Sequence, residues 1–514
     1  MLCKGGVTVQ GLIGRERVYT SFPEITRENV LQALSEANSV HFKNRKAIRF
    51  LFRYYRGDQP VYKRTKTVRE DIKHNTVVNH ASEIVRFLVS YLLADPAVYV
   101  LRKSADEAMT DDLRRLNDYM EMADKDSCDK EIADDFTICG TGYRFVYPNP
   151  DYTRGDEDKA PFTIDTYDPE RTYIAYEESP SRDPRPIFCV TASKAPQTKM
   201  PVYDLYTEDT HYIITGDPGR PQGVTIEEEP NLLGEIPMVE YVNNQFRMGG
   251  FEAVLDLLND TNVLESNRVE ATEQNVQALT WMNDVDLTEE EEERIRNNPS
   301  AFVYTRTIKG ATSPSIKAIV TDLQQQDQQV LQNDLYKKIL TIVGMPSTSD
   351  GNANDSSNNG STLVRNGWYQ AEARAKDTAK LWMRSDKKFL RLVFKCVNAL
   401  ADPLGISEKD ITCKFTRRNY EDIMTKATVL NTLLGNDKVA PVFAYTVSGL
   451  APDPEEACKM GLDWMEKQRD EEEDRLAKAA GASGGNEPGA GSGQSGGTQS
   501  GAGQSGAGPS GQNG

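Results

Sequence analysis

Apolar residues recur at helical spacing in three segments near the start of this 514-residue chain. The first segment predicts a helix over 24–56, and the last predicts one over 110–137. Between them, Asn75 is placed to cap the N-terminus of a helix that ends before Pro96, because the residue preceding a proline disfavours the α conformation. The first 137 residues are therefore expected to be mainly helical.

The pattern changes after Gly140. The string ICGTGYRFVY at 138–147 places glycines before an aromatic and β-branched run, which predicts a strand entered through a tight turn. Similar runs separated by turn residues predict an antiparallel β region. Its further strands are expected at 162–178, 186–193, 202–215, 223–230 and 234–244.

Two long, mostly polar segments follow the β region, at 251–282 and 320–343. Each carries apolar side chains only along a thin seam, so each predicts a helix that packs along a narrow stripe rather than in a core. The first would be roughly 45 Å long at 1.5 Å per residue. The pattern predicts a helical hairpin with a small insert, 283–319, at its tip.

The insert is expected to contain one acidic helix and two strands. The helix would begin at Thr288, with Glu291 three residues later completing a capping box. The acidic run that follows is typical of a solvated helix face, and a docking surface is the alternative. The two strands are expected at 301–310 and 315–320.

A polar loop and a basic helix come next. Residues 344–362 are nearly all Gly, Asn, Ser, Asp and Thr, which predicts a loop able to reach up to about 30 Å out and back. Residues 363–400 predict a helix with one apolar face and many Lys and Arg residues. Those cations are either a solvated face or a surface for phosphate or a partner.

The remainder is helical apart from one strand and the end of the chain. The strand is expected at 411–418, and helices at 420–434 and 454–480. Residues 481–514 are almost entirely Gly, Ser, Gln and Ala, a composition typical of a disordered tail.

Composition excludes several classes of protein. No apolar run reaches the roughly 18 residues needed to span a membrane, and the N-terminus lacks the apolar region of a secretory signal. The protein is thus expected in the cytosol when made.

A formal net charge of −18 is the reverse of the basic character of a tight nucleic-acid binder. The seven cysteines form no CxxC pair and are expected to be buried thiols.

No catalytic, metal-binding or cofactor-binding motif occurs in the sequence. It has no phosphate-binding GxxxxGK[ST] loop, no HExxH and no CxxC. His74 and His80 lie six residues apart, whereas a metal pair on one helix face would be three or four apart. We therefore expect neither an enzyme active site nor a metal or cofactor site.

Several strings, taken in order, resemble those of the portal proteins of tailed bacteriophages of the siphophage type. They are YYRGDQPVY (54–62), SYLLADPAVY (90–99), ICGTGYRFVY (138–147), EIPMVEYVNN (235–244) and Leu335-Tyr336-Lys337. Ala94 stands where the family has glycine, and Arg144 stands where an acidic or polar residue is common. The resemblance extends over residues 25 to about 470.

The resemblance implies an α+β portal fold and assigns each segment of the chain a part of it. It implies a mixed wing domain (1–250), a stem of two helices (251–282 and 320–343), a small α/β clip (283–319), a tunnel loop (344–362), a long wing helix (363–400), a helical crown (401–480) and the disordered tail (481–514).

The resemblance also implies a function and partners. Twelve copies would form a ring at one capsid vertex, the channel through which double-stranded DNA is packaged, retained and ejected without sequence recognition. The partners would be the terminase large subunit, a head–tail adaptor, and the major capsid and scaffolding proteins, with no membrane. The protein would occupy the virion, and the host cytoplasm during assembly.

Two sets of site residues follow. The tunnel would be lined by Asn352, Asn354, Asp355, Ser356, Asn358 and Asn359, with Lys337 and Lys338 offering phosphate contacts. The clip would dock terminase and adaptor through Glu289, Glu290, Glu291, Glu292, Glu293, Arg294 and Arg296. Two alternatives remain: a virion scaffold or adaptor that never contacts DNA, and a nuclease or protease of the packaging machinery.

Overall fold

The computed structural model contains two compact units, one up to Lys426 and one from Ala427, and each is described separately. It describes residues 14–65, 73–102, 107–220, 222–276, 279–297, 302–305, 314–319, 325–347, 367–415, 423–436, 438–451 and 454–482. Among these, helices accompany sheets whose strand pairs are mostly antiparallel, so the class is α+β as expected.

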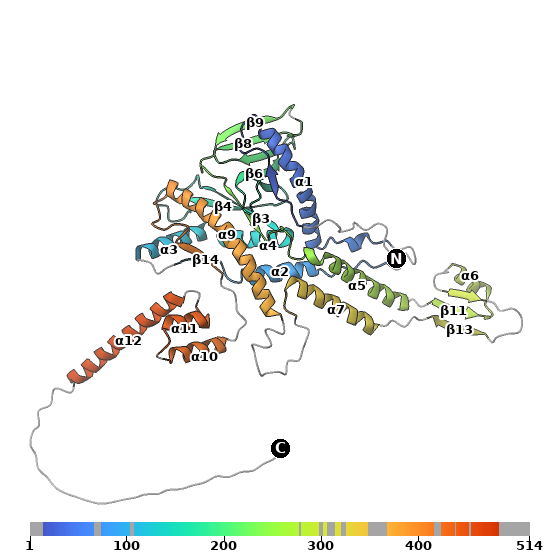
Figure 1. The fold of residues 1–514 in the computed structure, drawn as a ribbon. Helices are drawn as coiled ribbons and strands as arrows, with labels where there is room; N and C mark the ends of the chain where they lie inside the picture. The colour runs from blue at the N-terminus through green and yellow to red at the C-terminus, as the bar shows by residue number, and fades with distance from the viewer. Residues whose placement is uncertain are drawn as a thin grey trace, which may run out of the picture. The chain divides into compact units, whose positions relative to one another are not determined.

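The first unit begins with a short strand and a series of helices (Figure 1). Their bounds are β1 (Val18–Thr20), α1 (Val30–Tyr55), the 3-10 helix η1 (Pro60–Lys63), α2 (His80–Leu92), β2 (Val98–Leu101), α3 (Glu107–Met122) and α4 (Lys125–Cys139). The segment expected to form one helix over 110–137 is divided, because Asp124 adopts a left-handed conformation with φ 50° between α3 and α4.

Eight further strands build two sheets. They are β3 (Thr141–Pro148), β4 (Phe162–Tyr167), β5 (Thr172–Glu177), β6 (Pro186–Lys194), β7 (Pro201–Tyr206), β8 (Thr210–Thr215), β9 (Thr225–Pro230) and β10 (Met238–Val242). One sheet has the order β1-β5-β6-β7-β8-β9 and is antiparallel except for the β1–β5 pair, and the other has the order β10-β3-β4. The predicted β region is thus confirmed as two sheets.

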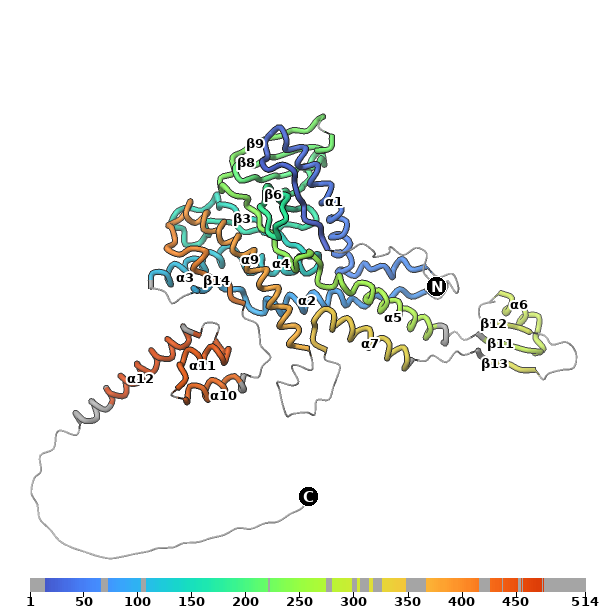
Figure 2. Tube along the Cα trace, in the orientation of Figure 1, coloured from blue at the N-terminus to red at the C-terminus, as the bar shows by residue number. Residues whose placement is uncertain are grey.

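Helices cover both sheets. The N-terminal half of α1 packs Val30, Leu34 and Ala37 against buried side chains of the six-stranded sheet, including Phe188 and Leu205. The long helix α9 (Trp368–Leu400) crosses the β10-β3-β4 sheet (Figure 2). A larger core joins that sheet to α2, α4 and α9.

A buried ionic cluster lies in this larger core. Arg144 of β3, which occupies the position where the family often has an acidic residue, is fully buried and pairs with Asp129 of α4. Its other guanidinium nitrogen lies 3.8 Å from Asp386 of α9, and Lys125 pairs with Asp129 from the opposite side. Burial alone would lower the pKa of Lys125, but the negative charges of Asp129 and Asp386 outweigh it and raise that pKa. Two cations and two carboxylates thus balance inside the core.

The hairpin consists of α5 (Leu255–Val276), preceded by the 3-10 turn η2 (Glu252–Val254), and α7 (Gln325–Val343). The two helices lie side by side (Figure 1). Helix α5 ends earlier than expected, because residues 279–283 form a strand instead of its last turn. The insert between them contains β11 (Leu279–Asn283), α6 (Glu289–Asn297), β12 (Phe302–Thr305) and β13 (Ser315–Ile319). Its sheet has the order β12-β11-β13.

The first unit ends after α9 with β14 (Ile411–Lys414), which pairs with β2. The segment predicted as the crown, 401–480, therefore contributes its first strand to the first unit. The boundary between the units falls within α10 (Ile423–Leu434). The second unit contains the rest of that helix, α11 (Pro441–Ser448), which the sequence pattern did not predict, and α12 (Pro454–Ala482). The predicted tail, from 483 onward, lies outside the described residues.

Candidate functional site

Polar side chains make the contacts between the two hairpin helices. Arg268 of α5 donates to the side-chain oxygens of Gln332 and Gln329 of α7, the latter at 3.1 Å. Gln332 also donates to Glu265, which accepts from Arg268 at 3.2 Å. At this level the two helices are therefore joined by hydrogen bonds, and the ion pair between Arg268 and Glu265 within α5 orients the side chains that make them.

A second polar contact holds α5 along its length. Residues 73–79 run extended beside the helix, and we call this segment the strap. The backbone N–H groups of Val78, Thr76 and His74 donate to side-chain oxygens of α5 at 2.8, 3.0 and 3.2 Å. The three acceptors are Asn262, Ser266 and Glu270, respectively.

The repeat of the strap contacts follows from backbone geometry. Four residues of a helix advance about 6 Å, and two residues of an extended chain advance about 6.6 Å. Every fourth residue of α5 can therefore meet every second N–H of the strap. The expected N-cap, Asn75, is wrong for this reason: it lies within the strap, and Asn79 caps α2 by accepting from Ser82 N–H at 3.3 Å.

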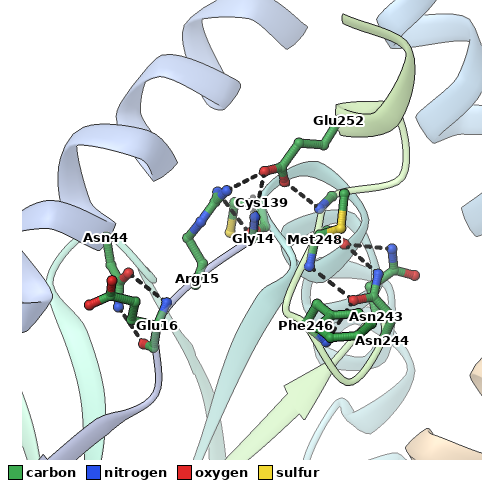
Figure 3. A network of polar contacts seen from close by, with 11 residues as sticks. Gly14, Arg15, Glu16, Asn44, Cys139, Asn243, Asn244, Phe246, Met248 and Glu252 are labelled. Atoms are coloured by element: carbon green, nitrogen blue, oxygen red, sulfur yellow. Dashed lines mark hydrogen bonds and ion pairs between the residues drawn. The ribbon is translucent and has the colours of Figure 1, made fainter. Parts of the chain in front are cut away.

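The elbow, residues 243–252, connects the β10-β3-β4 sheet to α5 (Figure 3). The side-chain amides of Asn243 and Asn244 both donate to the carbonyl oxygen of Met248, at 2.9 and 3.0 Å. Glu252 accepts from Gly249 N–H at 2.8 Å and from the guanidinium of Arg15 at 2.6 Å. These contacts give the Asn243-Asn244 motif a structural role, since they fix the turn from which the hairpin begins.

Glycine makes the elbow compact. Gly140 has φ 91°, and a Cβ atom there would lie 2.0 Å from the carbonyl oxygen of Arg247. A Cβ at Gly249 would lie 2.3 Å from the carbonyl oxygen of Ile138. No side chain fits at either position, so the backbone of the elbow rests directly on the end of α4.

Arg247 and Glu240 strengthen the same junction. The guanidinium of Arg247 donates two hydrogen bonds of 2.7 Å to the two carboxylate oxygens of Glu240. Burial would raise the pKa of Glu240, but the charge and hydrogen bonds of Arg247 outweigh it and lower that pKa. Sequence reasoning missed both this pair and the Arg15–Glu252 pair. Arg15 and Glu252 are 237 residues apart, and Glu240 and Arg247 meet only because the elbow turns the chain back on β10.

Arg374 of α9 connects the end of α7 to the elbow, the two points at which the hairpin joins the rest of the chain. Its guanidinium donates to the carbonyl oxygen of Val343, at the end of α7, and to that of Gly250, in the elbow, at 3.4 Å. Burial lowers the pKa of Arg374. The negative end of the α7 helix dipole compensates part of the charge.

The outer faces of the hairpin are apolar in places. Val330, Leu331 and Ile342 of α7 are 68%, 48% and 55% exposed, and Val263 and Val269 of α5 are also exposed. By contrast, Asn262, Ser266 and Glu270 of α5 are buried. The seam that the sequence predicted to pack is therefore partly open to solvent, while a polar row is covered.

The predicted site residues fall into three groups. The tunnel residues Asn352, Asn354, Asp355, Ser356, Asn358 and Asn359 lie outside the described residues. Lys337 and Lys338 are exposed on α7, and Lys338 pairs with Asp334 at 2.7 Å. Glu289 to Glu293, Arg294 and Arg296 are on α6, which has no buried residue.

The acidic helix α6 has a clear local explanation. Thr288 donates to Glu291 through both its backbone N–H and its hydroxyl, each at 2.9 Å, so the expected link between these residues is confirmed. These bonds lower the pKa of Glu291. Four glutamates in the first turn and two arginines in the last complement the helix dipole. A solvated helix and a docking surface both remain compatible with this geometry.

The structure does not bring the candidate metal ligands together. His74 pairs with Glu273, whereas His80 contacts Glu83 at 2.7 Å. Within the described ranges, no cluster of three or more His, Cys, Asp or Glu side chains has the arrangement of a metal site. Of the helices in those ranges, none has both the length and the hydropathy to cross a bilayer.

Comparison with known proteins decides the family. The family model described as phage portal protein, SPP1 Gp6-like, matches residues 35–461, most of the chain. The chain belongs to this portal protein family. It is thus a phage head–tail connector component, and its family is one of structural proteins.

The other comparisons add little to the portal assignment. A solved structure titled as the neck of a native GTA particle with C12 symmetry has a TM-score of 0.40 and 8% sequence identity, over 72% of this chain and 89% of that one. No curated protein matches the chain.

Proposed function

We propose that the protein forms a closed ring of twelve copies at one vertex of the phage head, with the α5–α7 hairpins side by side around a central DNA channel. The proposal rests on which side chains of the hairpin are in contact with the rest of the chain and which are exposed. The base of the hairpin is anchored in the larger core, where Leu258 and Ile339 are buried. Beyond that base its contacts at Arg268–Gln332 and along the strap are polar, while apolar side chains such as Val330 and Leu331 are exposed.

Packing against a second copy would remove those apolar side chains from water. Fully burying a Val, Leu or Ile side chain is worth about 1.5–3 kcal/mol. Val330, Leu331 and Ile342 would each contribute at every interface of the ring. A closed ring repeats one interface without leaving an open end, so every copy benefits equally.

The second unit supports assembly independently. Its apolar residues with little exposure are Ala444 and Cys458 among those described, whereas Phe443, Trp464 and Met465 are more than half exposed. A small three-helix unit with so slight a core needs further partners to be stable. Copies of the same unit, repeated around the ring, would supply them.

The channel would carry double-stranded DNA during packaging, retention and ejection. A net charge of −18 favours passage without a deep binding well, since phosphates are repelled rather than neutralised. In this proposal the loop containing Asn352, Asn354, Asp355, Ser356, Asn358 and Asn359 forms the constriction. Lys337 and Lys338 would make weak contacts with phosphates near it.

The insert would dock the packaging terminase and later the head–tail adaptor. Glu289 to Glu293, Arg294 and Arg296 are presented on one short helix, which has no buried residue. Charged residues at the rim of an interface favour exchange of partners, because they set association rate more than affinity. Major capsid and scaffolding proteins would surround the rest of the ring.

Electron microscopy of the purified full-length protein tests the proposal. The expected result is a closed ring with an axial opening wide enough for duplex DNA. Monomers or open filaments would contradict it. A ring with a closed centre would favour the alternative, a virion scaffold or adaptor that does not contact DNA.

A further inference from the structure

A groove lies between α9, β14 and the residue that follows β2. It encloses about 260 Å³. Four of its lining side chains are cationic: Arg102, Lys380, Arg384 and Lys387. The whole chain has a net charge of −18, so four cationic side chains around one groove stand out from the rest of the molecule.

Three of the cations form a row on α9. Lys380, Arg384 and Lys387 are separated by four and three residues, so they share one face over roughly 10 Å of the helix. Arg102 faces the groove from the strand side, where its Nε donates to the carbonyl oxygen of Ile411 at 2.9 Å. That bond holds the guanidinium at the edge of β14.

Among the residues that the structure describes around the groove, little negative charge offsets this row. Lys380 pairs with Asp377, but the two side chains are 70% and 77% exposed, and such pairs are weak. Arg384 shares the single carboxylate of Asp183 with Lys388, at 2.8 and 2.9 Å. Among the residues that the structure describes, Lys387 forms no ion pair within 4.0 Å.

The one carboxylate lining the groove is directed inward. Asp386 is 1% exposed, and its Oδ1 accepts from the hydroxyl of Tyr241 at 3.2 Å and faces Arg144. The two cations of the buried cluster, Lys125 and Arg144, balance Asp386 and Asp129 within the core. The wall of the groove therefore presents a net positive charge to solvent.

We propose that this groove binds the phosphodiester backbone of double-stranded DNA, without sequence recognition, at a place separate from the channel. The proposal rests on the proposed function, which brings the ring into contact with a packaged genome. A row of Lys and Arg side chains neutralises phosphates and does not read base edges.

Duplex DNA is favoured over an acidic protein segment as the occupant. It carries one charge per about 1.7 Å of helix axis in a regular array, so a fixed row of cations meets phosphates without ordering a flexible chain. A disordered acidic peptide would lose conformational entropy on binding. The groove would hold DNA beside the ring, apart from the channel through which DNA passes.

Salt-dependent DNA binding by the full-length protein tests the groove. A fluorescent duplex is titrated with wild type, with the double variant Lys380→Gln/Lys387→Gln, and with Lys376→Gln as the matched control. Lys376 lies one turn earlier on α9, outside the groove, where it pairs with Glu372 at 3.4 Å. Since each lost phosphate contact lowers the slope of log K against log salt by about 0.9, the double variant should lose about 1.8 and the control nothing.

Equal slopes for wild type and the double variant would overturn the proposal. Poly-glutamate serves as a competitor in a second experiment. If it displaces DNA at equal concentration of charge, the groove is assigned to an acidic protein partner, and this result would also overturn the proposal of DNA binding. Electron microscopy of the same samples separates the two proposals. Loss of binding with intact rings supports the groove, whereas absence of rings in wild type contradicts the proposed function and leaves the binding result standing.

Discussion

Ser266 of α5 accepts a hydrogen bond from the backbone of Thr76. Its Oγ accepts from the N–H of Thr76 at 3.0 Å and donates to the carbonyl oxygen of Asn262, one turn earlier in α5, at 2.7 Å. This is the middle of the three strap contacts, between those of Asn262 and Glu270. The strap thus holds α5 by bonds that depend on direction, not by burial of apolar surface.

Replacing Ser266 by alanine should loosen the strap. The Thr76 N–H would lose its acceptor, which costs about 1–3 kcal/mol when the donor is shielded from water. The gain in helix propensity from Ser to Ala is at most about 0.5 kcal/mol, so the loss dominates. Chemical denaturation should show the lower free energy of unfolding, and hydrogen exchange at Thr76 should become faster.

Thr272→Ala is the matched control for this prediction. Thr272 is exposed on the same helix, and its hydroxyl donates within the helix to the carbonyl oxygen of Arg268 at 2.9 Å. It should leave exchange at Thr76 unchanged. If Ser266→Ala behaves like Thr272→Ala, the strap does not stabilise α5.

The exposed side chains of α7 should control assembly. An aspartate in place of Val330 or Leu331 would put a charge into an apolar contact between copies, where burial without a partner is costly. We expect either variant to form fewer rings while remaining folded, because surface substitutions usually change stability by less than about 0.5 kcal/mol. Light scattering after size exclusion, together with circular dichroism, measures both properties.

Gln326→Asp introduces the same charge at an exposed polar position of α7 and serves as the control. It should assemble as wild type does. Normal ring formation by Val330→Asp and Leu331→Asp would show that this face of the hairpin is not an interface between copies.

Asp135 of α4 should make stability depend on pH. Burial, followed by the nearby charges of Asp168, Asp134 and Glu131, raises its pKa to about 8, compared with about 3.9 for an unfolded chain. The folded state therefore binds the proton more tightly. Its contribution to stability is complete below about pH 4 and is lost as pH rises through about 8.

Asp135→Asn should remove this dependence. Melting temperatures at pH 6.5 and 8.5 are the useful pair, because His41, whose pKa burial lowers to about 4, is already largely neutral there in the folded state. Wild type should lose stability between the two values and the variant should lose less. An equal decrease in both proteins would show that Asp135 is not the group responsible.

Local signals in the sequence were sufficient for several elements. Thr288 and Glu291 lie three residues apart and form the expected contact, since a helix cap needs only its own first turn. The β region after Gly140 and the polar hairpin follow from periods of two and 3.6. The motif at Asn243 and Asn244 was recognised by resemblance, and the structure adds why those amides are needed.

Contacts between distant residues explain what the sequence did not reveal. Asn75 and Asn79 are equally good N-caps, and only the bonding of the strap to α5 decides between them. Asp124 interrupts a helical pattern because its backbone is left-handed, a conformation that the residue type alone does not predict. Arg144 appeared as a departure from the family, yet Asp129 and Asp386 compensate it from other elements. A spacing of four between Asn262, Ser266 and Glu270 was the one available signal for the strap.

A deletion tests whether the predicted tunnel loop forms the constriction around DNA. Deleting residues 350–359 removes Asn352, Asn354, Asp355, Ser356, Asn358 and Asn359, but leaves untouched the polar contacts between α5 and α7 and the bonds from Arg374 to Val343 and Gly250. Rings should therefore still assemble, whereas DNA packaging or retention should fall. Exchange of the same ten residues for Gly and Ser separates loop length from side-chain chemistry, and should preserve function if a yielding loop of sufficient reach is all that is required. Particles of the deletion variant that package and retain a full genome would show that the constriction around DNA is built elsewhere.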